Sequence, residues 1–333
     1  MRLSRLNLLA SFFLAAILSA PAWGATPALP GTVNYVEGQV YIGDQTLDAK
    51  SVGSASLQAG QTLTTQSGKA EVLLTPGVFV RIGDDSAATL ISPSLTNTEV
   101  ALAKGQAVVE VAEIHRDNLL RIQQQGANTQ LLKAGVYGFD ATNGDVRVFQ
   151  GEALVQEGDR QVKVKGGHQL NVTNADNLKP AKFNKEQYEQ TDLYRFSNLR
   201  SEYLAEANVD AARVYVAGGP AWYGAGWYWD PFFTAYTWIP GDGILYSPFG
   251  WGFYSPFWVG YAPYYGRYYP YGYVGGHPRP YLGGHRPPSF TGHQPGLGAR
   301  PSNTFPGPWA ASAAAPHFGV MGGGFHGGGG FHR

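Results

Sequence analysis

Apolar and polar residues alternate along the first half of the chain, in short segments that each begin with glycine. Val146 and Val148, for example, flank Arg147 just after Gly144. A period of two places alternate side chains on one face of a strand, and a preceding glycine is typical of a tight turn. Seven segments share this pattern, at residues 38–42, 68–72, 77–82, 105–111, 144–148, 151–155 and 166–172. The pattern predicts an all-β region over residues 30–173.

The glycine spacing bears on how these strands are arranged. Gly144, Gly151 and Gly158 recur every seven residues, and units this short must stack on their neighbours to enclose a core. A β-solenoid or a rolled sheet meets this requirement. A hairpin meander folded as a β-sandwich would give a similar alternation. We therefore expect a β-solenoid or rolled sheet, with a β-sandwich as the alternative.

The N-terminus has the order of a secretory signal peptide. Two arginines precede an apolar run at residues 8–20, and a proline and small residues follow it. The run is shorter than the roughly 20 residues that a membrane-spanning helix needs. We expect residues 1–24 to be removed by cleavage between Gly24 and Ala25, which leaves the mature chain without a transmembrane span. Because the chain has no cysteine, a lipid anchor on cysteine is excluded.

Residues 180–214 follow a different period. Leu193, Phe196, Leu199 and Tyr203 recur at spacings of three or four among charged residues, which predicts one amphipathic helix. We expect this helix to cover unpaired strand edges at the open end of the β region. The alternative is a helix that docks on a partner.

The block at residues 215–273 is aromatic and almost uncharged. From residue 215 to the end, the charged residues are five Arg and two Asp, whereas seven of the eight Trp lie there. Frequent Gly and Pro exclude long helices and central strands, so we expect largely irregular structure. Burying one large aromatic ring is worth roughly 2 to 3 kcal/mol, so the rings should dock, first on the β region, otherwise on another copy, glycan or lipid headgroups. The candidates for self-association are Trp227, Trp229, Trp251 and Trp258.

The last segment, residues 274–333, is of low complexity, and its composition predicts disorder. Imidazole is a common ligand of Zn, Cu and Ni. Five histidines are therefore candidate metal ligands: His277, His285, His293, His326 and His332. No carboxylate or thiol accompanies them, and the first three recur at an eight-residue spacing that fixes no geometry. Weak, adventitious metal binding is the expectation.

The sequence offers little for catalysis. Without cysteine, a thiolate nucleophile, an iron–sulfur cluster and a zinc–thiolate site are excluded. His115 and His168 lie in polar segments, and Asp84 and Asp85 follow a glycine as turn residues do. Lys and Arg number 24 and so do Asp and Glu, so no net charge favours nucleic acid. We predict a protein that is not an enzyme and needs no cofactor.

The order of the strand motifs resembles the FecR-type periplasmic domain. The motifs that carry the resemblance are Gly38-Gln39-Val40, residues 57–65, 68–74 and 77–82, the strand at 102–111, Gly138-Phe139-Asp140-Ala141 and residues 146–155. They cover less than half of the chain. One departure lies at residues 125–128 and 135–139, where the family usually has a Thr-Pro ahead of a Gly-Thr-x-Phe element.

The resemblance implies a β-solenoid-like fold in the cell envelope. In the best-known members it also implies a relay of a surface signal to a cytoplasmic sigma factor, which needs a cytoplasmic segment and a membrane span ahead of the β domain. The sequence shows neither before residue 30. We therefore expect a FecR-like module used on its own, and whether a sigma factor is coupled through another protein stays open.

Together these observations predict an exported, non-enzymatic binding module in the periplasm or on the outer surface of a Gram-negative-type bacterium. Its partner would be an envelope protein or a glycan, and not nucleic acid. The alternative is a structural or assembly protein that acts through its aromatic and glycine-rich tail. The third hypothesis is that the tail binds metal ions.

Overall fold

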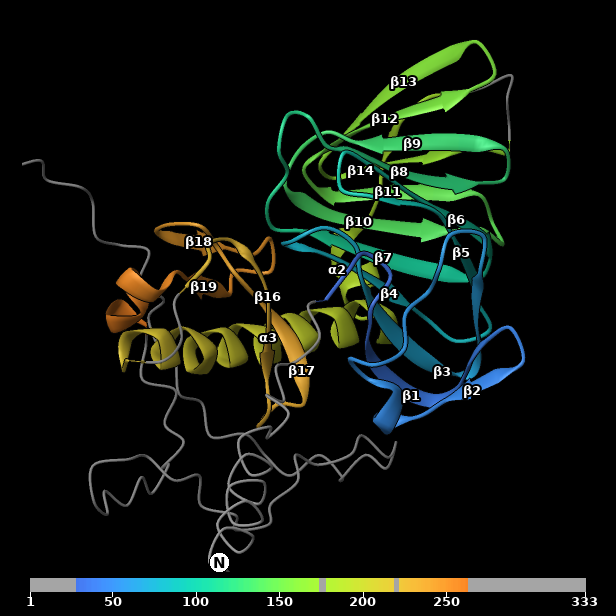
Figure 1. Cartoon of the computed structure of the whole chain (residues 1–333). Helices are drawn as coiled ribbons and strands as arrows, with labels where there is room; N and C mark the ends of the chain where they lie inside the picture. The colour runs from blue at the N-terminus through green and yellow to red at the C-terminus, as the bar shows by residue number, and fades with distance from the viewer. Residues whose placement is uncertain (1–27, 174–177, 219–221, 263–333) are drawn as a thin grey trace, which may run out of the picture. The chain divides into compact units, whose positions relative to one another are not determined.

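The computed structural model describes residues 28–173, 178–218 and 222–262 (Figure 1). The predicted signal peptide with its cleavage site at Gly24 and Ala25 lies outside the described residues. So does the predicted disordered segment 274–333, with all five candidate metal-ligating histidines.

Within the described residues, fifteen strands form one sheet. They are β1 (Val33–Ile42), β2 (Gln45–Leu47), β3 (Thr62–Leu73), β4 (Val78–Ile82), β5 (Ala87–Ser94), β6 (Asn97–Lys104), β7 (Gln106–Val111), β8 (Leu119–Gln124), β9 (Ala127–Leu131), β10 (Gly135–Asp140), β11 (Asp145–Gln150), β12 (Glu152–Glu157), β13 (Arg160–Lys165), β14 (His168–Asn171) and β15 (Ala181–Lys182). A short 3-10 helix, η1 (Ala49–Ser51), follows β2.

The sheet has two limbs that meet at β3. The strand order is β13-β12-β9-β8-β6-β5-β3-β4-β7-β10-β11-β14-β15, and β1 pairs with both β2 and β3. Residues 62–64 of β3 pair with β5, whereas residues 70–73 pair with β4. All neighbours along this order are antiparallel except β6 and β8. One long strand therefore belongs to both limbs and turns the sheet back on itself.

Glycine is required where β1 crosses the middle of β3. Gly38 lies opposite Gly68 at an irregularity in the register. The φ of Gly38 is 70°, and a Cβ built there would lie 2.2 Å from the carbonyl oxygen of Ser67. A side chain would be strained in this conformation and would collide with backbone. The two strands can therefore keep their close approach only with glycine at this position.

One hydrophobic core lies between the limbs. It contains Ile122 of β8 and Val155 of β12 from one limb, and Val109 of β7 and Val148 of β11 from the other. The predicted alternation is present, since Val146 and Val148 are fully buried in this core. The all-β prediction is confirmed as one large mixed sheet that is not closed. The more specific β-solenoid form stays a prediction.

Two helices follow the sheet. A short helix, α2 (Lys185–Glu189), begins after Asn184, whose side chain accepts a hydrogen bond from the Gln187 amide. The long helix α3 (Asp192–Val216) begins after Thr191, which is extended. A helix is therefore present where the sequence predicts one, but it is interrupted at residues 190–191. It packs across β4 and β7 rather than along a strand edge, because the outward face of these strands carries aromatic and charged side chains that need a cover.

The aromatic block is more regular than the sequence predicts. Two hairpins and a 3-10 helix form there: β16 (Gly226–Asp230) with β17 (Ala235–Ile239), β18 (Ile244–Tyr246) with β19 (Gly252–Tyr254), and η3 (Pro256–Tyr261). The expectation of largely irregular structure is wrong for these residues. Gly and Pro limit the strands to three to five residues without preventing them, because aromatic side chains suit short paired strands.

The two hairpins dock within the same chain. The Phe79 ring on β4 lies 5.0 Å from that of Trp227, and the Trp238 ring lies 5.4 Å from that of Phe253. These rings share a buried cluster with Leu204 of α3. The expected docking on the β region is confirmed for residues 222–262 of this block. Residues 192–218 and 222–262 are called the C-terminal module below.

Candidate interaction site

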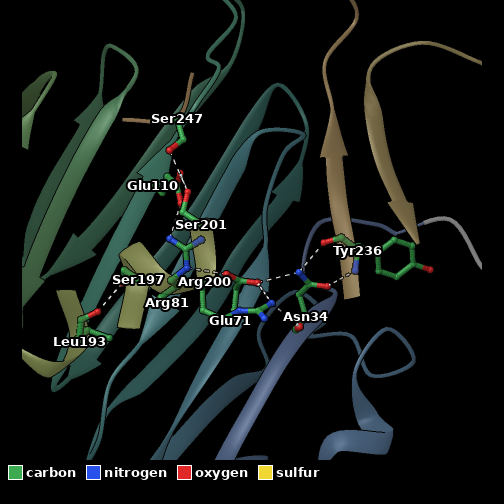
Figure 2. A network of polar contacts seen from close by, with 10 residues as sticks. All are labelled: Asn34, Glu71, Arg81, Glu110, Leu193, Ser197, Arg200, Ser201, Tyr236 and Ser247. Carbon is green, nitrogen blue, oxygen red and sulfur yellow. Dashed lines mark hydrogen bonds and ion pairs between the residues drawn. The ribbon is translucent and has the colours of Figure 1, made fainter. Parts of the chain in front are cut away.

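A buried network of charged side chains joins the C-terminal module to the sheet. Glu71 of β3 lies opposite Arg81 of β4, and Glu110 projects from β7 on the same outward face. All three are 0% exposed because α3 and the following strands cover them. Figure 2 shows how the side chains from the sheet and from the C-terminal module converge.

Ion pairs form the centre of this network. Arg81 donates from Nε to Glu71 at 2.7 Å and from Nη1 to Glu110 at 2.6 Å. Arg200 of α3 donates to the other oxygen of Glu71 at 2.9 Å, and its guanidinium lies 4.6 Å from the centre of the Tyr35 ring. Two arginines thus face two glutamates, and the buried cluster has no net charge.

Uncharged groups extend the network into the C-terminal module. Ser201 of α3 donates to Glu110 at 2.7 Å and contacts the Ser247 hydroxyl at 3.1 Å. Asn34 of β1 donates to the Tyr236 carbonyl at 2.9 Å and accepts from the Tyr236 amide at 2.7 Å, as drawn in Figure 2. The Asn34 amide therefore pairs with β17 much as a neighbouring strand would.

Asn208 has a similar role two turns further along α3. Its side chain donates to the carbonyls of Trp238 and Tyr254 at 2.9 and 3.0 Å, and it accepts from the Tyr254 amide at 2.7 Å. Because it is 0% exposed, these bonds satisfy backbone groups that would otherwise be buried without a partner. Asn208 thereby fixes both hairpins to the helix.

The buried charges of the network stabilise one another in their ionised forms. Burial alone would raise the pKa of Glu71, but Arg200 and Arg81 outweigh it and lower this pKa to about 2. Burial would lower the pKa of Arg81, yet Glu110 and Glu71 more than compensate and raise it. These groups stay ionised at neutral pH. Such a pair donates and accepts no proton there.

The other candidates for chemistry in the sequence do not converge. In the parts of the chain that the structure describes, no group of three His, Asp or Glu side chains could hold a metal ion. Asp85 has a φ of 48° in a turn and pairs with Lys104, as expected of a turn residue. The His115 ring lies 3.8 Å from Glu113, and both His115 and Lys104 are well exposed.

Four aromatic side chains of the C-terminal module are exposed, one before β16 and three on η3. They are Tyr223, Phe257, Trp258 and Tyr261, whose exposed fractions are 88%, 80%, 41% and 73%. The ring of Phe257 lies 6.0 Å from that of Trp222, and the ring of Trp258 lies 5.5 Å from that of Tyr261. Trp258 also donates to Asp242 at 3.1 Å. These four residues are called the aromatic surface below.

This surface overlaps only in part with the tryptophans predicted for self-association. Trp227, Trp229 and Trp251 are partly buried against the cluster that contains Trp238. Trp258 belongs to the aromatic surface, and the sequence analysis missed its neighbours. One signal was present in the sequence. Proline favours the first turn of a helix, so Pro256 indicated that a helical turn begins there. A helical turn buries Val259 and leaves the flanking rings outside.

The carboxyl group of Asp230, at the turn between β16 and β17, makes the stability of the folded protein depend on pH. Its carboxylate is 5% exposed and accepts hydrogen bonds from the amides of Phe232 and Phe233 at 2.8 and 2.9 Å. Burial raises the pKa of Asp230 to about 6, with a further contribution from Asp210, although the two amides oppose the shift. The folded state therefore binds this proton more tightly than the unfolded state, and ionisation at neutral pH costs stability.

We expect Asp230→Asn to stabilise the protein at pH 7 by about 1–3 kcal/mol, because asparagine keeps the acceptor oxygen and removes the buried charge. The gain should shrink as the pH falls from 6 and vanish near pH 4, where the wild-type carboxyl is protonated in the folded state. Urea unfolding at several pH values measures this difference. A gain that is equal at pH 4 and pH 7 would contradict the assignment.

No helix within the described ranges is long and apolar enough to span a membrane.

Comparison with known proteins finds a family model that matches part of the sheet. The family model described as FecR protein matches residues 61–158, which run from just before β3 to the end of β12. No curated protein gives a match. Two crystal structures of a "putative anti-sigma factor" from Parabacteroides distasonis ATCC 8503 are similar at 16% and 15% sequence identity, with TM-scores of 0.31 and 0.32.

Each comparison covers 41% of this chain and 62% or 63% of the solved chain. The match therefore spans about three fifths of the length of the structures that it resembles. The family model lies wholly within the fifteen-stranded sheet, which continues on both sides of it. The resemblance stated from the strand motifs is confirmed: residues 61–158 of this chain form a FecR domain.

Proposed function

We propose that this protein is an exported, non-enzymatic interaction module of the cell envelope. The FecR domain is its scaffold, and the aromatic surface is its contact with a protein partner. The observation that carries the proposal is the exposure of four aromatic side chains of the C-terminal module, Tyr223, Phe257, Trp258 and Tyr261. Export rests on the signal-peptide pattern in residues 1–24 and accords with a FecR domain.

The size of the aromatic surface supports an interaction. A large aromatic side chain contributes roughly 150–250 Å², so these four rings together expose on the order of 500 Å². The largest apolar patch on a typical monomer has about this size and is often a functional one. Aromatic side chains are also the residues that most often dominate the binding energy of protein interfaces.

The buried joint supports the scaffold role. Because Asn34, Arg200 and Ser201 bind the sheet and the C-terminal module to each other, the aromatic surface is held by a rigid support. Rigid presentation lowers the entropy that a partner must overcome on binding. The buried charged side chains bond to one another between the sheet and the C-terminal module. This accords with a protein that is not an enzyme.

Substitution of the two most exposed rings of η3 tests the proposal. We expect the full chain with Phe257→Ser and Tyr261→Ser to keep its melting temperature but to lose a partner that the wild type captures from an envelope extract. The matched control is Leu95→Ser with Leu119→Ser, which removes two exposed apolar side chains, 56% and 41% exposed, from the sheet. Capture that is equal for wild type, variant and control would contradict the proposal.

The same surface favours a second candidate function, a structural or assembly role in which copies of this chain associate. Trp258 is both exposed and one of the tryptophans predicted for self-association. Sedimentation velocity of the same variants separates the two functions. A wild-type oligomer that the Phe257→Ser and Tyr261→Ser variant converts to a monomer supports assembly. A monomeric wild type supports the binding of a different protein.

A further inference from the structure

The limb of the sheet that contains β8, β9, β12 and β13 carries a row of amide side chains on its outward face. In the register of β8, β9, β12 and β13, Gln123 lies opposite Asn128, Asn128 opposite Gln156, and Gln156 opposite Gln161. An adjacent row runs from Arg121 through Gln130 and Leu154 to Lys163 by the same pairings. Figure 1 shows these four strands side by side in one limb of the sheet.

A cleft of about 330 Å³ opens on this face. This volume is at the lower end of the roughly 300–1,000 Å³ typical of ligand pockets. The side chains that line it are Arg121, Asn128, Gln130, Leu154, Gln156 and Gln161. Gly126 and Gly158, at the tips of the two hairpins, complete the lining, and a side chain at either position would meet only open space.

Strand formation does not account for these amides. The inward side chains of the same strands, such as Ile122 and Val155, already bury the core. Asparagine is disfavoured in strands, and β-branched or charged residues are the usual choice on a solvated face. A concentration of amides in one concave place therefore indicates a requirement other than folding.

Glu99, on the neighbouring strand β6, holds part of this face in position. Its carboxylate is largely buried and accepts from Arg121 Nη2 at 2.5 Å and Nε at 3.2 Å. Gln123 also donates to Glu99, and Asn128 does so at 3.4 Å. The charge of Arg121 is thereby balanced within the protein, and three polar side chains on this face are fixed in advance.

The remaining amides are available to a ligand. Within the described part of the chain, the side chains of Gln130 and Gln161 make no hydrogen bond, and Gln156 donates to the Gly158 carbonyl at 3.3 Å. Each amide offers two donors and a carbonyl acceptor. Gln130, Gln156 and Gln161 therefore present donors and acceptors together at the edge of the cleft.

This chemistry selects a class of ligand. Arg121 is the charged side chain in the lining of the cleft, and it is paired with Glu99, so the lining itself offers no uncompensated charge for an anion. Its lining contains no aromatic ring and only Leu154 as an apolar side chain, which differs from the anchors of protein interfaces. Hydroxyl groups both donate and accept, as the amides do. We propose that this cleft binds a neutral oligosaccharide, with sugar hydroxyls on Gln130, Gln156 and Gln161 and a sugar C–H face on Leu154.

The site lies on the sheet, whereas the aromatic surface lies on η3 and just before β16. Its test is therefore independent of the proposed protein partner. Maltoheptaose, cellopentaose and chitopentaose are titrated into the full chain by calorimetry, with saturation-transfer NMR as a second readout. We expect at least one of them to bind saturably. Gln130→Ala with Gln156→Ala should weaken that binding about tenfold or more, because the hydrogen bonds from two amides to the sugar are lost.

The control is Gln39→Ala with Gln45→Ala, which removes two exposed glutamines from β1 and β2 outside the cleft. It should bind as the wild type does. All variants should melt at the wild-type temperature, since the four side chains point away from the core. No saturable binding of any of the three sugars, or binding that the cleft variant leaves unchanged, would overturn the proposal. Tighter binding of an extended Gly-Ser peptide than of the sugars would also overturn the proposal.

Discussion

Replacing Arg81 with methionine should lower the free energy of unfolding by about 3–5 kcal/mol, the usual cost of breaking a buried ion pair from one side. Arg81 is 0% exposed and is bonded to both Glu71 and Glu110. Methionine fills similar space but leaves two carboxylates buried with a single cation, Arg200, and with hydrogen bonds from Asn34 and Ser201. The size of the effect follows from the uncompensated charge and not from lost volume.

Urea unfolding monitored by tryptophan fluorescence measures this loss. Arg116→Met is the matched control, because Arg116 is exposed and exposed charges contribute at most about 1 kcal/mol. A second variant, with Glu71→Gln added to Arg81→Met, removes one of the stranded charges and should recover part of the loss. An Arg81→Met protein as stable as the control would show that the network does not hold the C-terminal module.

Replacing Trp238 with alanine should cost about 3–5 kcal/mol, as for other large aromatic side chains in protein cores. Trp238 is 0% exposed and packs in one cluster with Phe79 of the sheet and Leu204 of the helix. The cavity would open where three parts of the chain meet. We therefore expect the sheet and the C-terminal module to lose stability together.

Trp258→Ala is the matched control, since it removes the same side chain from a site that is 41% exposed. It should change the unfolding free energy by less than about 1 kcal/mol. Hydrogen exchange of β10 and β17 amides in the Trp238→Ala protein shows whether both parts respond. Loss of protection confined to β17 would contradict a single cooperative unit.

The alternation of apolar residues was enough to predict the sheet, because the inward side chains of each strand must be apolar whatever the topology. Val146 and Val148 illustrate this. The order of motifs was enough to predict the FecR domain. The way in which β3 joins the two limbs could not be predicted. It depends on which residues of this one long strand pair with β4 and which pair with β5, and the alternation is the same in both parts.

The buried network was missed for a related reason. Glu71, Arg81 and Glu110 occupy polar positions in alternating strands, and such positions normally face water. They are buried because the helix that begins at Asp192 and the strands after it pack over them, and no local pattern shows where these later elements will pack. Likewise, the aromatic block contained too many rings for its sequence to show which would be buried, as Trp238 is, and which exposed, as Phe257 is.

The most direct test of the interaction role is photo-crosslinking in the living cell from a benzoylphenylalanine at position 257. A second chain with the same probe at Lys165, an exposed position on β13, is the reference. We predict that the probe at 257 forms a discrete adduct, either with another protein or with a second copy of this chain, and that the probe at 165 does not. Equal adducts from both positions, or none from 257, would contradict the central claim.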